Sequence, residues 1–260
     1  MNKQETIKPF KPKPNGRVVC NFSCGAASAV ATKLAIKEYK TVQIIYCDTG
    51  SEHSDNKRFL TDCERWFGQK ITILKSAKYK NIFEVFEKTR FLSSAYGAPC
   101  TGEMKKKPAQ EFWRLGDTEI FGYTSDEQHR LERWKKDNPE RIIKTPLIDK
   151  FLTKQDCYGA LARAKIELPA QYKLGFNNNN CITCVKARDS LDYWRRVRKY
   201  HPLEFEKMAK LEKDIGHAIN RQTINGEKQP IFLDDIPPGD PIGRAPDIQC
   251  GLFCMAEMDA

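Results

Sequence analysis

The chain has 260 residues, of which 40% are hydrophobic and 30% charged, a composition typical of a globular protein with one good core. Lysine and arginine number 44 against 34 aspartates and glutamates, and the net charge of +10 suits an anionic partner such as a nucleotide or a nucleic acid. No apolar stretch approaches the roughly 18 residues of a membrane helix, and the N-terminus lacks the apolar core of a signal peptide. We therefore expect a cytoplasmic protein that does not interact with membranes.

The first 150 residues alternate between strand-like and helix-like patterns. A proline-containing basic arm is expected at 1–16, and strand-like apolar runs follow at 17–22, 42–47, 70–74 and 118–123. Helical patterns come after them, at about 26–39, 54–67, 81–89 and 126–136. Continuous apolar strands are typical of a parallel sheet that is covered on both faces. The sequence therefore predicts an α/β fold with an open, mainly parallel, doubly wound (Rossmann-like) sheet over 17–150.

The remainder of the chain has a different pattern. Helical periodicity dominates from about residue 151 to 217, which predicts a helical, cysteine-containing part packed on the sheet. Residues 218–260 contain turn-rich stretches such as Asp235-Ile-Pro-Pro-Gly-Asp-Pro241, and we expect them to form an extended C-terminal tail. The sequence gives no indication of the oligomeric state.

Small residues fill the turn after the first predicted strand. The turn consists of Ser23, Cys24, Gly25, Ala26, Ala27 and Ser28. Backbone N–H groups at the start of a helix, together with serine hydroxyls, form an anion site that needs no lysine. The turn after the second strand, Asp48-Thr49-Gly50, should lie at the same edge of the sheet, where ligands of open α/β sheets bind. Asp48 is placed there to accept a hydrogen bond from a ribose hydroxyl or an adenine amine.

The chain contains ten cysteines, which in a reducing compartment are more typical of metal ligands or catalytic thiols than of disulfides. Cys181 and Cys184 have the two-residue gap that places two thiolates on one metal ion or cluster. Cys100 and the pair Cys250 and Cys254 are further candidates. Zinc and an iron–sulfur cluster both fit this spacing.

Five motifs occur in an order that resembles the phosphoadenosine phosphosulfate (PAPS) reductase family of the adenine nucleotide alpha hydrolase-like superfamily. The loop at 23–28 resembles the family's pyrophosphate loop (PP-loop) S-G-G-x-D-S, and Asp48-Thr49-Gly50 with Glu52 resembles its second-strand motif. The other three are FGYTSDEQHR (121–130), TPLIDKFLTKQDCYGAL (145–161) and LPAQYKLGFNNNNCITC (168–184). The resemblance implies that an adenine nucleotide, either ATP or a sulfonucleotide (PAPS or adenosine phosphosulfate, APS), binds at 23–28, 48–50 and Arg130.

The loop departs from the family pattern at two positions. Cys24 replaces the first glycine and Ala27 replaces the aspartate. In the family that aspartate assists enzymes that split ATP between its α and β phosphates. Its replacement therefore favours sulfonucleotide reduction over ATP pyrophosphatase chemistry.

The resemblance also extends to the cysteines. Cys100 lies in PCTGEMKKKP, which is similar to a C-C-x-x-x-K-x-x-P segment of sulfonucleotide reductases whose cysteine pair joins a distant C-x-x-C around a [4Fe–4S] cluster. Pro99 replaces the first cysteine of that pair, so a fourth ligand must come from elsewhere. The tail segment QCGLF resembles the family's E-C-G-L-H signature, which implies that Cys250 is the nucleophile. The ligands are then Cys100, Cys181, Cys184 and Cys254. In an alternative assignment Cys250 and Cys254 both join the C-x-x-C, which leaves Cys100 as the reactive thiol.

Three functions are compatible with these features. The first is an oxidoreductase of sulfur metabolism that reduces a sulfonucleotide with an external thiol reductant such as thioredoxin. The second is ATP-dependent sulfur transfer to a nucleic acid, of the tRNA thiolation or DNA phosphorothioation type. The third is a non-catalytic nucleotide-binding protein. The replaced loop aspartate and the tail motif favour the first.

Overall fold

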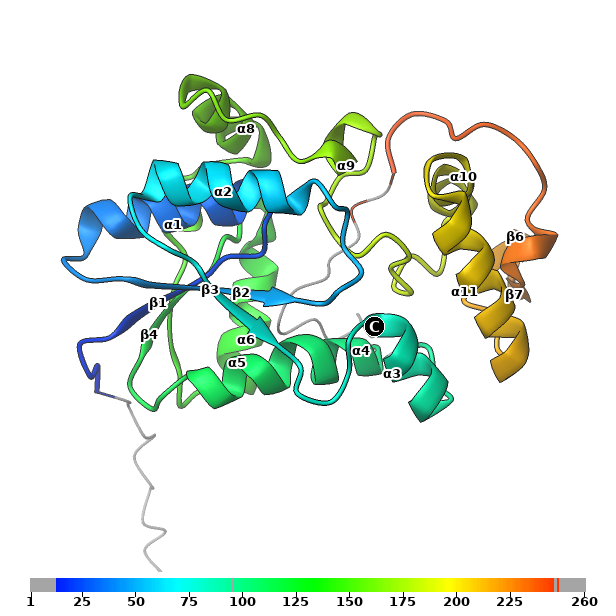
Figure 1. The fold of residues 1–260 in the computed structure, drawn as a ribbon, viewed down its shortest axis with the longest axis horizontal. Helices are drawn as coiled ribbons and strands as arrows, with labels where there is room; N and C mark the ends of the chain where they lie inside the picture. Colours follow the sequence, from blue (N-terminus) through cyan, green and yellow to red (C-terminus); the bar gives the residue numbers. More distant parts are fainter. Residues whose placement is uncertain (1–12, 95, 246, 248–260) are drawn as a thin grey trace, which may run out of the picture.

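The computed structural model describes residues 13–94, 96–245 and 247, and a five-stranded parallel sheet forms its centre (Figure 1). The order across the sheet is β3-β2-β1-β4-β5, and every neighbouring pair is parallel. The strands are β1 (Val18–Asn21), β2 (Gln43–Asp48), β3 (Thr72–Lys75), β4 (Thr118–Ile120) and β5 (Ile142–Lys144). The chain runs outwards from β1 to β3 on one side, then crosses to β4 on the other side of β1. This order creates a topological switch point between the carboxyl ends of β1 and β4.

Helices cover both faces of the sheet, which confirms the predicted doubly wound α/β fold. One face packs against α1 (Ala26–Glu38), α2 (Asn56–Phe67) and α8 (Lys154–Arg163), with the short helix α7 (Pro146–Asp149) beside them. The other face packs against α5 (Lys107–Phe112) and α6 (Gln128–Asp137). Side chains of a strand point alternately to its two faces. Val18 and Cys20 therefore pack under α1, α2 and α8, while Val19 packs on the opposite face with α5 and α6. Burial on both sides explains why these strands are continuous apolar runs.

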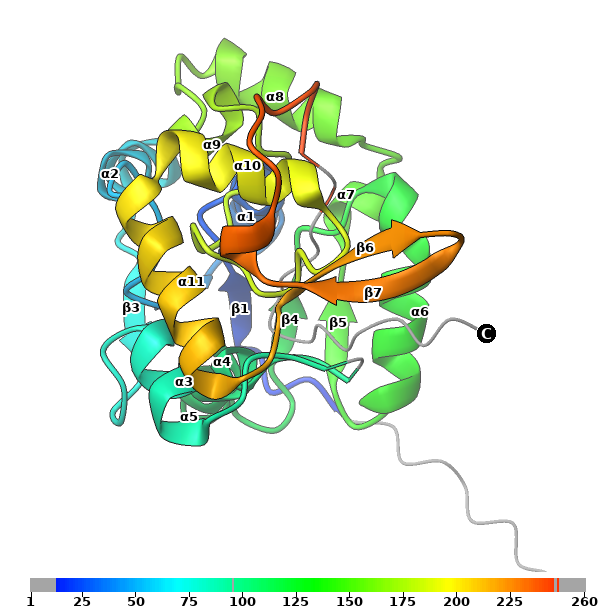
Figure 2. The same ribbon diagram turned by 90° about the vertical axis from the view of Figure 1, so that its right-hand side faces the viewer.

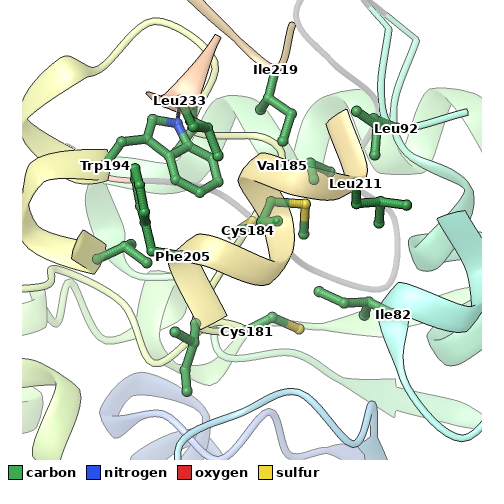
Figure 3. Packing of buried hydrophobic residues seen from close by; sticks show 14 of the residues in the cluster. Ile82, Leu92, Cys181, Cys184, Val185, Trp194, Phe205, Leu211, Ile219 and Leu233 are labelled. Carbon is green, nitrogen blue, oxygen red and sulfur yellow. Dashed lines mark hydrogen bonds between the residues drawn. The ribbon is translucent and has the colours of Figure 1, made fainter. Parts of the chain in front are cut away.

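A second group of elements lies beyond the carboxyl ends of the strands and has a core of its own, here called the second core (Figures 1 and 2). It comprises α3 (Ile82–Thr89), α4 (Pro99–Thr101), α10 (Leu191–Tyr200), α11 (Pro202–Ile215), the hairpin β6 (Asn220–Ile224) and β7 (Glu227–Ile231), and the 3-10 turn η3 (Leu233–Asp235). Figure 3 shows Trp194, Leu211 and Leu233 from three of these elements packed around Cys184. The short helix α9 (Ala170–Lys173) leads from α8 into this group.

The hairpin lies within residues 218–260, for which the sequence predicted an extended tail. Its turn residues Asn225 and Gly226 both have positive φ, 52° and 85°. A type I′ turn needs this conformation, and Asn-Gly is its preferred sequence. The Asn-Gly pair was therefore the local signal for this hairpin.

A continuous helical segment over residues 99–112 changes its pitch in the middle. The π-helical turn η1 (Gly102–Lys106) separates α4 from α5, and Pro108 lies in the first turn of α5. A proline inside a helix cannot donate to the preceding turn and crowds it, and a local widening relieves that crowding. None of the helices in the described ranges combines the length and the apolar character that crossing a membrane requires.

Candidate active site

A cavity opens at the switch point, where the chain leaves the carboxyl ends of β1 and β4. Its walls come from the loop after β1, the end of β2, the segment after β4 and the chain around residues 172–180. Ligands of open α/β sheets bind at this position, because the strand order reverses there and leaves a crevice. Each of the five predicted motifs contributes at least one residue to the cavity lining.

The loop after β1 lines this cavity through Ser23, Gly25, Ala27 and Ser28. The Ser28 hydroxyl accepts hydrogen bonds from the Ser23 backbone N–H and the Ser23 hydroxyl, each at 3.0 Å, and donates to the Gly25 carbonyl at 3.0 Å. These bonds hold the loop in a compact turn immediately before α1. The start of α1 therefore faces the cavity, and a helix start carries partial positive charge.

Two members of the predicted loop point elsewhere. Cys24 has a φ of +58° and is fully buried, with its Sγ 3.8 Å from the Asn56 carbonyl. Burial raises the pKa of the Cys24 thiol well above its usual value, so Cys24 remains protonated at neutral pH. The Ala26 backbone N–H donates to the Tyr172 hydroxyl at 3.3 Å, and Tyr172 also lines the cavity.

The segment after β4 lines the cavity beside the loop at 23–28, here called the serine loop, through Gly122, Tyr123, Asp126, Glu127 and Arg130. Arg130 forms an ion pair with Glu127, and its guanidinium carbon lies 4.5 Å from the centroid of the Tyr123 ring. Glu127 is itself fixed, since it accepts hydrogen bonds from the backbone N–H and the hydroxyl of Thr124. The predicted Arg130 and the serine loop therefore line the same cavity.

The predicted residues Asp48, Thr49 and Gly50 do not line this cavity. Asp48 accepts a hydrogen bond from the Gly50 N–H at 2.9 Å and pairs with Lys75 at 3.2 Å. Gly50 has a φ of +62°, and a Cβ there would lie 2.1 Å from the Lys80 carbonyl oxygen. These two residues shape a tight turn after β2, which directs Thr49 towards the cysteines.

Cys100, Cys181 and Cys184 line one smaller pocket, together with Thr49 and Lys105. The Thr49 hydroxyl oxygen lies 3.1 Å from Cys181 Sγ, and the Ile182 N–H donates to the Ser51 carbonyl at 3.0 Å. Figure 3 shows Cys181 and Cys184 among the apolar side chains of the second core. The structure thus brings Cys100 together with the Cys181 and Cys184 pair, which follows it by about 80 residues in the sequence.

Lys105 lines both the cysteine pocket and the larger cavity, so the two are neighbours. Within residues 13–94, 96–245 and 247, no group of three or more His, Cys, Asp or Glu side chains that could hold a metal ion is found. The other two predicted site cysteines, Cys250 and Cys254, lie outside the described residues.

Several residues that line the cavity were not predicted as site residues. They are Glu52, Lys105, Lys154, Tyr172, Asn178, Asn179, Asn180 and Asp247. Glu52 accepts a hydrogen bond from the Thr49 N–H at 3.2 Å, and burial raises its pKa while the charge of Lys105 opposes the shift. The run of four asparagines at 177–180 was the available signal, because consecutive amides rarely fill a helix and are suited to hydrogen bonding in a loop.

The model of the phosphoadenosine phosphosulfate reductase domain family matches residues 17–187. The chain belongs to this family. Members of the PAPS reductase family bind a nucleotide substrate, and the family belongs to the sulfur-reduction or sulfur-transfer class of enzymes.

Two other similarities accompany the family match. An uncharacterised protein of Methanocaldococcus jannaschii is 24% identical over 213 residues, covering 78% of this chain. This chain spans about half of that relative, 49% of its length. A crystal structure of phosphoadenylyl-sulfate (PAPS) reductase from Candida auris, in a phosphate complex, matches with a TM-score of 0.48 and 13% identity, covering 63% of this chain and 80% of that one.

Proposed function

We propose that this member of the PAPS reductase family is an enzyme that binds an adenine sulfonucleotide, PAPS or APS, and reduces its sulfonyl group with a cysteine thiol and an external dithiol such as thioredoxin. The observation that carries the proposal is the cavity at the switch point, which is lined by both the serine loop and Arg130. A cavity with this placement suits a nucleotide whose phosphates lie at the start of α1.

The cavity offers two kinds of group for the anionic part of such a ligand. Backbone N–H groups at the start of α1 donate hydrogen bonds to such a group, and the helix dipole of α1 adds positive potential. The Ser23 and Ser28 hydroxyls donate to it once they release the hydrogen bonds that they make within the loop. The Arg130 guanidinium supplies a fixed charge with several donors, which suits a phosphate or sulfate. These groups bind the nucleotide and orient its sulfonyl group.

We assign Cys250 as the nucleophile. The support is that Asp247 lines the cavity and that only three residues, spanning at most about 11 Å of extended chain, connect it to Cys250 in the sequence. Its thiolate attacks the sulfonyl sulfur, an S–S bond forms, and the S–O bond to the phosphate breaks with release of the nucleotide. The external dithiol then reduces the enzyme S-sulfonate, releasing sulfite and becoming a disulfide itself.

We further propose that Cys100, Cys181, Cys184 and Cys254 hold a [4Fe–4S] cluster, which supplies a redox and electrostatic centre when bound. The support is that three of these thiols line one pocket and that Lys105 and Lys186 also line it, because cations suit a cluster with four thiolates. A single zinc ion needs its sulfurs about 2.3 Å from one point. Among the described residues no set of three or more His, Cys, Asp or Glu side chains that could hold a metal ion is found, so metal analysis of the purified protein decides between zinc and the cluster.

The test is sulfite release from PAPS and from APS by the full chain, purified anaerobically and supplied with a dithiol. We expect Cys250→Ser to abolish release and Arg130→Gln to raise the substrate concentration needed. Cys63→Ser is the matched control, since Cys63 is buried in the core between α2 and the sheet and lines neither pocket. Binding of ATP with no turnover of either sulfonucleotide would overturn the proposal and support sulfur transfer to a nucleic acid.

A further inference from the structure

Each cation that lines the cavity faces a carboxylate that also lines it. Arg130 pairs with Glu127, and Lys105 acts electrostatically on Glu52. The third pair joins Lys154 Nζ to Asp247 Oδ1 at 3.0 Å. With the exposed Asp126, the described residues that line the cavity include four carboxylates and three cations.

This charge balance is unfavourable for a nucleotide, whose phosphates bring further negative charge into the cavity. Binding is therefore helped if a carboxylate leaves when the nucleotide arrives. Glu52 is held by the Thr49 backbone N–H, and Glu127 by the backbone and hydroxyl of Thr124. Both belong to turns that directly follow strands of the sheet.

Asp247 is held differently. It belongs to the C-terminal part of the chain, 93 residues after Lys154, and its carboxylate is bound by the side chains of Lys154 and Asn178. Its side chain is 46% exposed, against 16% for that of Glu127. Of the three paired carboxylates, Asp247 is the one whose departure leaves the sheet and its loops unchanged.

Lys154 is well placed to exchange partners. It begins α8, which is fixed by the reciprocal hydrogen bonds between Thr153 and Asp156. Its ammonium also donates to Asn178 Oδ1 at 2.9 Å, and Asn178 lines the same cavity. An oxygen of a phosphate or sulfate accepts a hydrogen bond from an ammonium as a carboxylate oxygen does. The Asp247 carboxylate therefore occupies the position that such an anionic group would take.

We propose that Lys154 binds an anionic group of the nucleotide and that Asp247 is a displaceable counterion, which gives up Lys154 when the nucleotide binds. This inference rests on the proposed function, because it names the residues that recognise the nucleotide's charge. It makes Asp247 a competitor of phosphate or sulfate groups and leaves the recognition of adenosine to the rest of the cavity.

The experiment is a calorimetric titration of the full chain with ATP, PAPS and adenosine, using Lys154→Gln, Asp247→Asn and the double variant. We expect Lys154→Gln to weaken ATP and PAPS binding about ten-fold. Asp247→Asn should tighten both about three-fold, since the pair is partly exposed, and should have no effect in the Lys154→Gln background. Adenosine affinity should be the same in all four proteins.

Two variants serve as matched controls. Lys173→Gln removes a lysine from an ion pair with Glu167, and Asp240→Asn removes an aspartate from a pair with Lys199. None of these residues lines the cavity, so nucleotide affinity should not change. Equal ATP affinity in the wild type, Asp247→Asn and Lys154→Gln would overturn this inference and leave the proposed function standing. A wild type that binds none of the nucleotides would overturn the proposed function as well.

Discussion

Gly122, which follows β4, packs directly against the start of α1: a Cβ at Gly122 would lie 2.6 Å from both the backbone nitrogen and the Cα of Ser28. These two residues belong to neighbouring segments that both line the cavity. The absence of a side chain at Gly122 therefore sets how closely the β4 segment approaches the serine loop.

We predict that Gly122→Ala weakens ATP or PAPS binding at least ten-fold, because the new methyl group displaces the serine loop from β4. Overpacking of this kind costs about 1–3 kcal/mol of unfolding free energy, so the chain should still fold. Calorimetry and urea denaturation measure the two effects. Gly159→Ala is the control: it lies inside α8, where its Cβ would meet only the end of the Arg163 side chain at 3.3 Å among its near neighbours. Unchanged nucleotide affinity in Gly122→Ala would contradict the proposed position of the phosphates.

Some parts of the fold could be predicted from the sequence, and others could not. Apolar runs placed β1, β2 and β4, because both faces of these strands are buried and local pattern determines them. Strand β5 has three residues, of which Ile143 alone is buried, so no run marks it. The helical segment at 99–112 contains Pro99 and Pro108, which indicate a break, whereas a π turn accommodates the second proline.

The candidate site, like the fold, could be predicted only in part. The serine loop and Arg130 carry local motifs, and both line the cavity. Lys154 lies in the motif at 145–161, but no local signal pairs it with Asp247, because the two residues are 93 positions apart and meet only through tertiary packing. Asp48 and Gly50 also match a motif, yet their side-chain and backbone contacts serve the turn after β2.

Thr49 links the β2 turn to the cysteine pocket. Its side chain is buried and its hydroxyl lies 3.1 Å from Cys181 Sγ. We predict that Thr49→Val, which keeps the shape and removes the hydroxyl, lowers the unfolding free energy by about 1 kcal/mol in urea denaturation. Thr223→Val, at an exposed position of β6, should change it by less than about 0.5 kcal/mol. Equal effects of the two substitutions would show that the Thr49 contact contributes nothing.

A buried carboxyl group should make stability depend on pH. Glu119 in β4 is 2% exposed and pairs with Arg141, and burial raises its pKa from 4.5 to about 7 despite that arginine. The folded chain therefore holds a proton that the unfolded chain releases between these two values. Stability is highest below about pH 4.5 for this group and falls as pH rises towards 7.

We predict that ionisation of Glu119 lowers the unfolding free energy by up to about 3 kcal/mol as the pH rises from 5 to 8. The slope is about 1.4 kcal/mol per pH unit. Glu119→Gln cannot ionise, so its unfolding free energy should fall less over this range in urea denaturation. Burial also raises the pKa of Glu212 to about 7, so the wild type and Glu119→Gln both retain the pH dependence that Glu212 causes. Glu111→Gln, at an exposed position of α5, should retain the wild-type slope. A slope unchanged by Glu119→Gln would contradict the assignment.

The cysteine pocket leads to a prediction about metal content. Protein purified anaerobically should carry iron and acid-labile sulfide, and Cys181→Ser or Cys184→Ser should remove both. Either substitution should also destabilise the second core, since Cys181 and Cys184 belong to it and ligand binding is coupled to folding. Cys63→Ser should retain iron and sulfide, because Cys63 lies in the core between α2 and the sheet. Stoichiometric zinc without sulfide would contradict the iron–sulfur assignment.

The two tail cysteines separate the roles of ligand and nucleophile. If Cys254 completes the cluster and Cys250 attacks the sulfonyl sulfur, Cys254→Ser loses iron whereas Cys250→Ser keeps it and releases no sulfite. Cys250→Ser should also fail to form an S-sulfonate, which mass spectrometry detects as the mass of an added SO₃ group on the wild-type chain after incubation with PAPS or APS without dithiol. Loss of iron in Cys250→Ser with retention in Cys254→Ser would reverse the two roles. Loss in both would make both cysteines ligands and leave Cys100, which lines the pocket beside Lys105, as the reactive thiol.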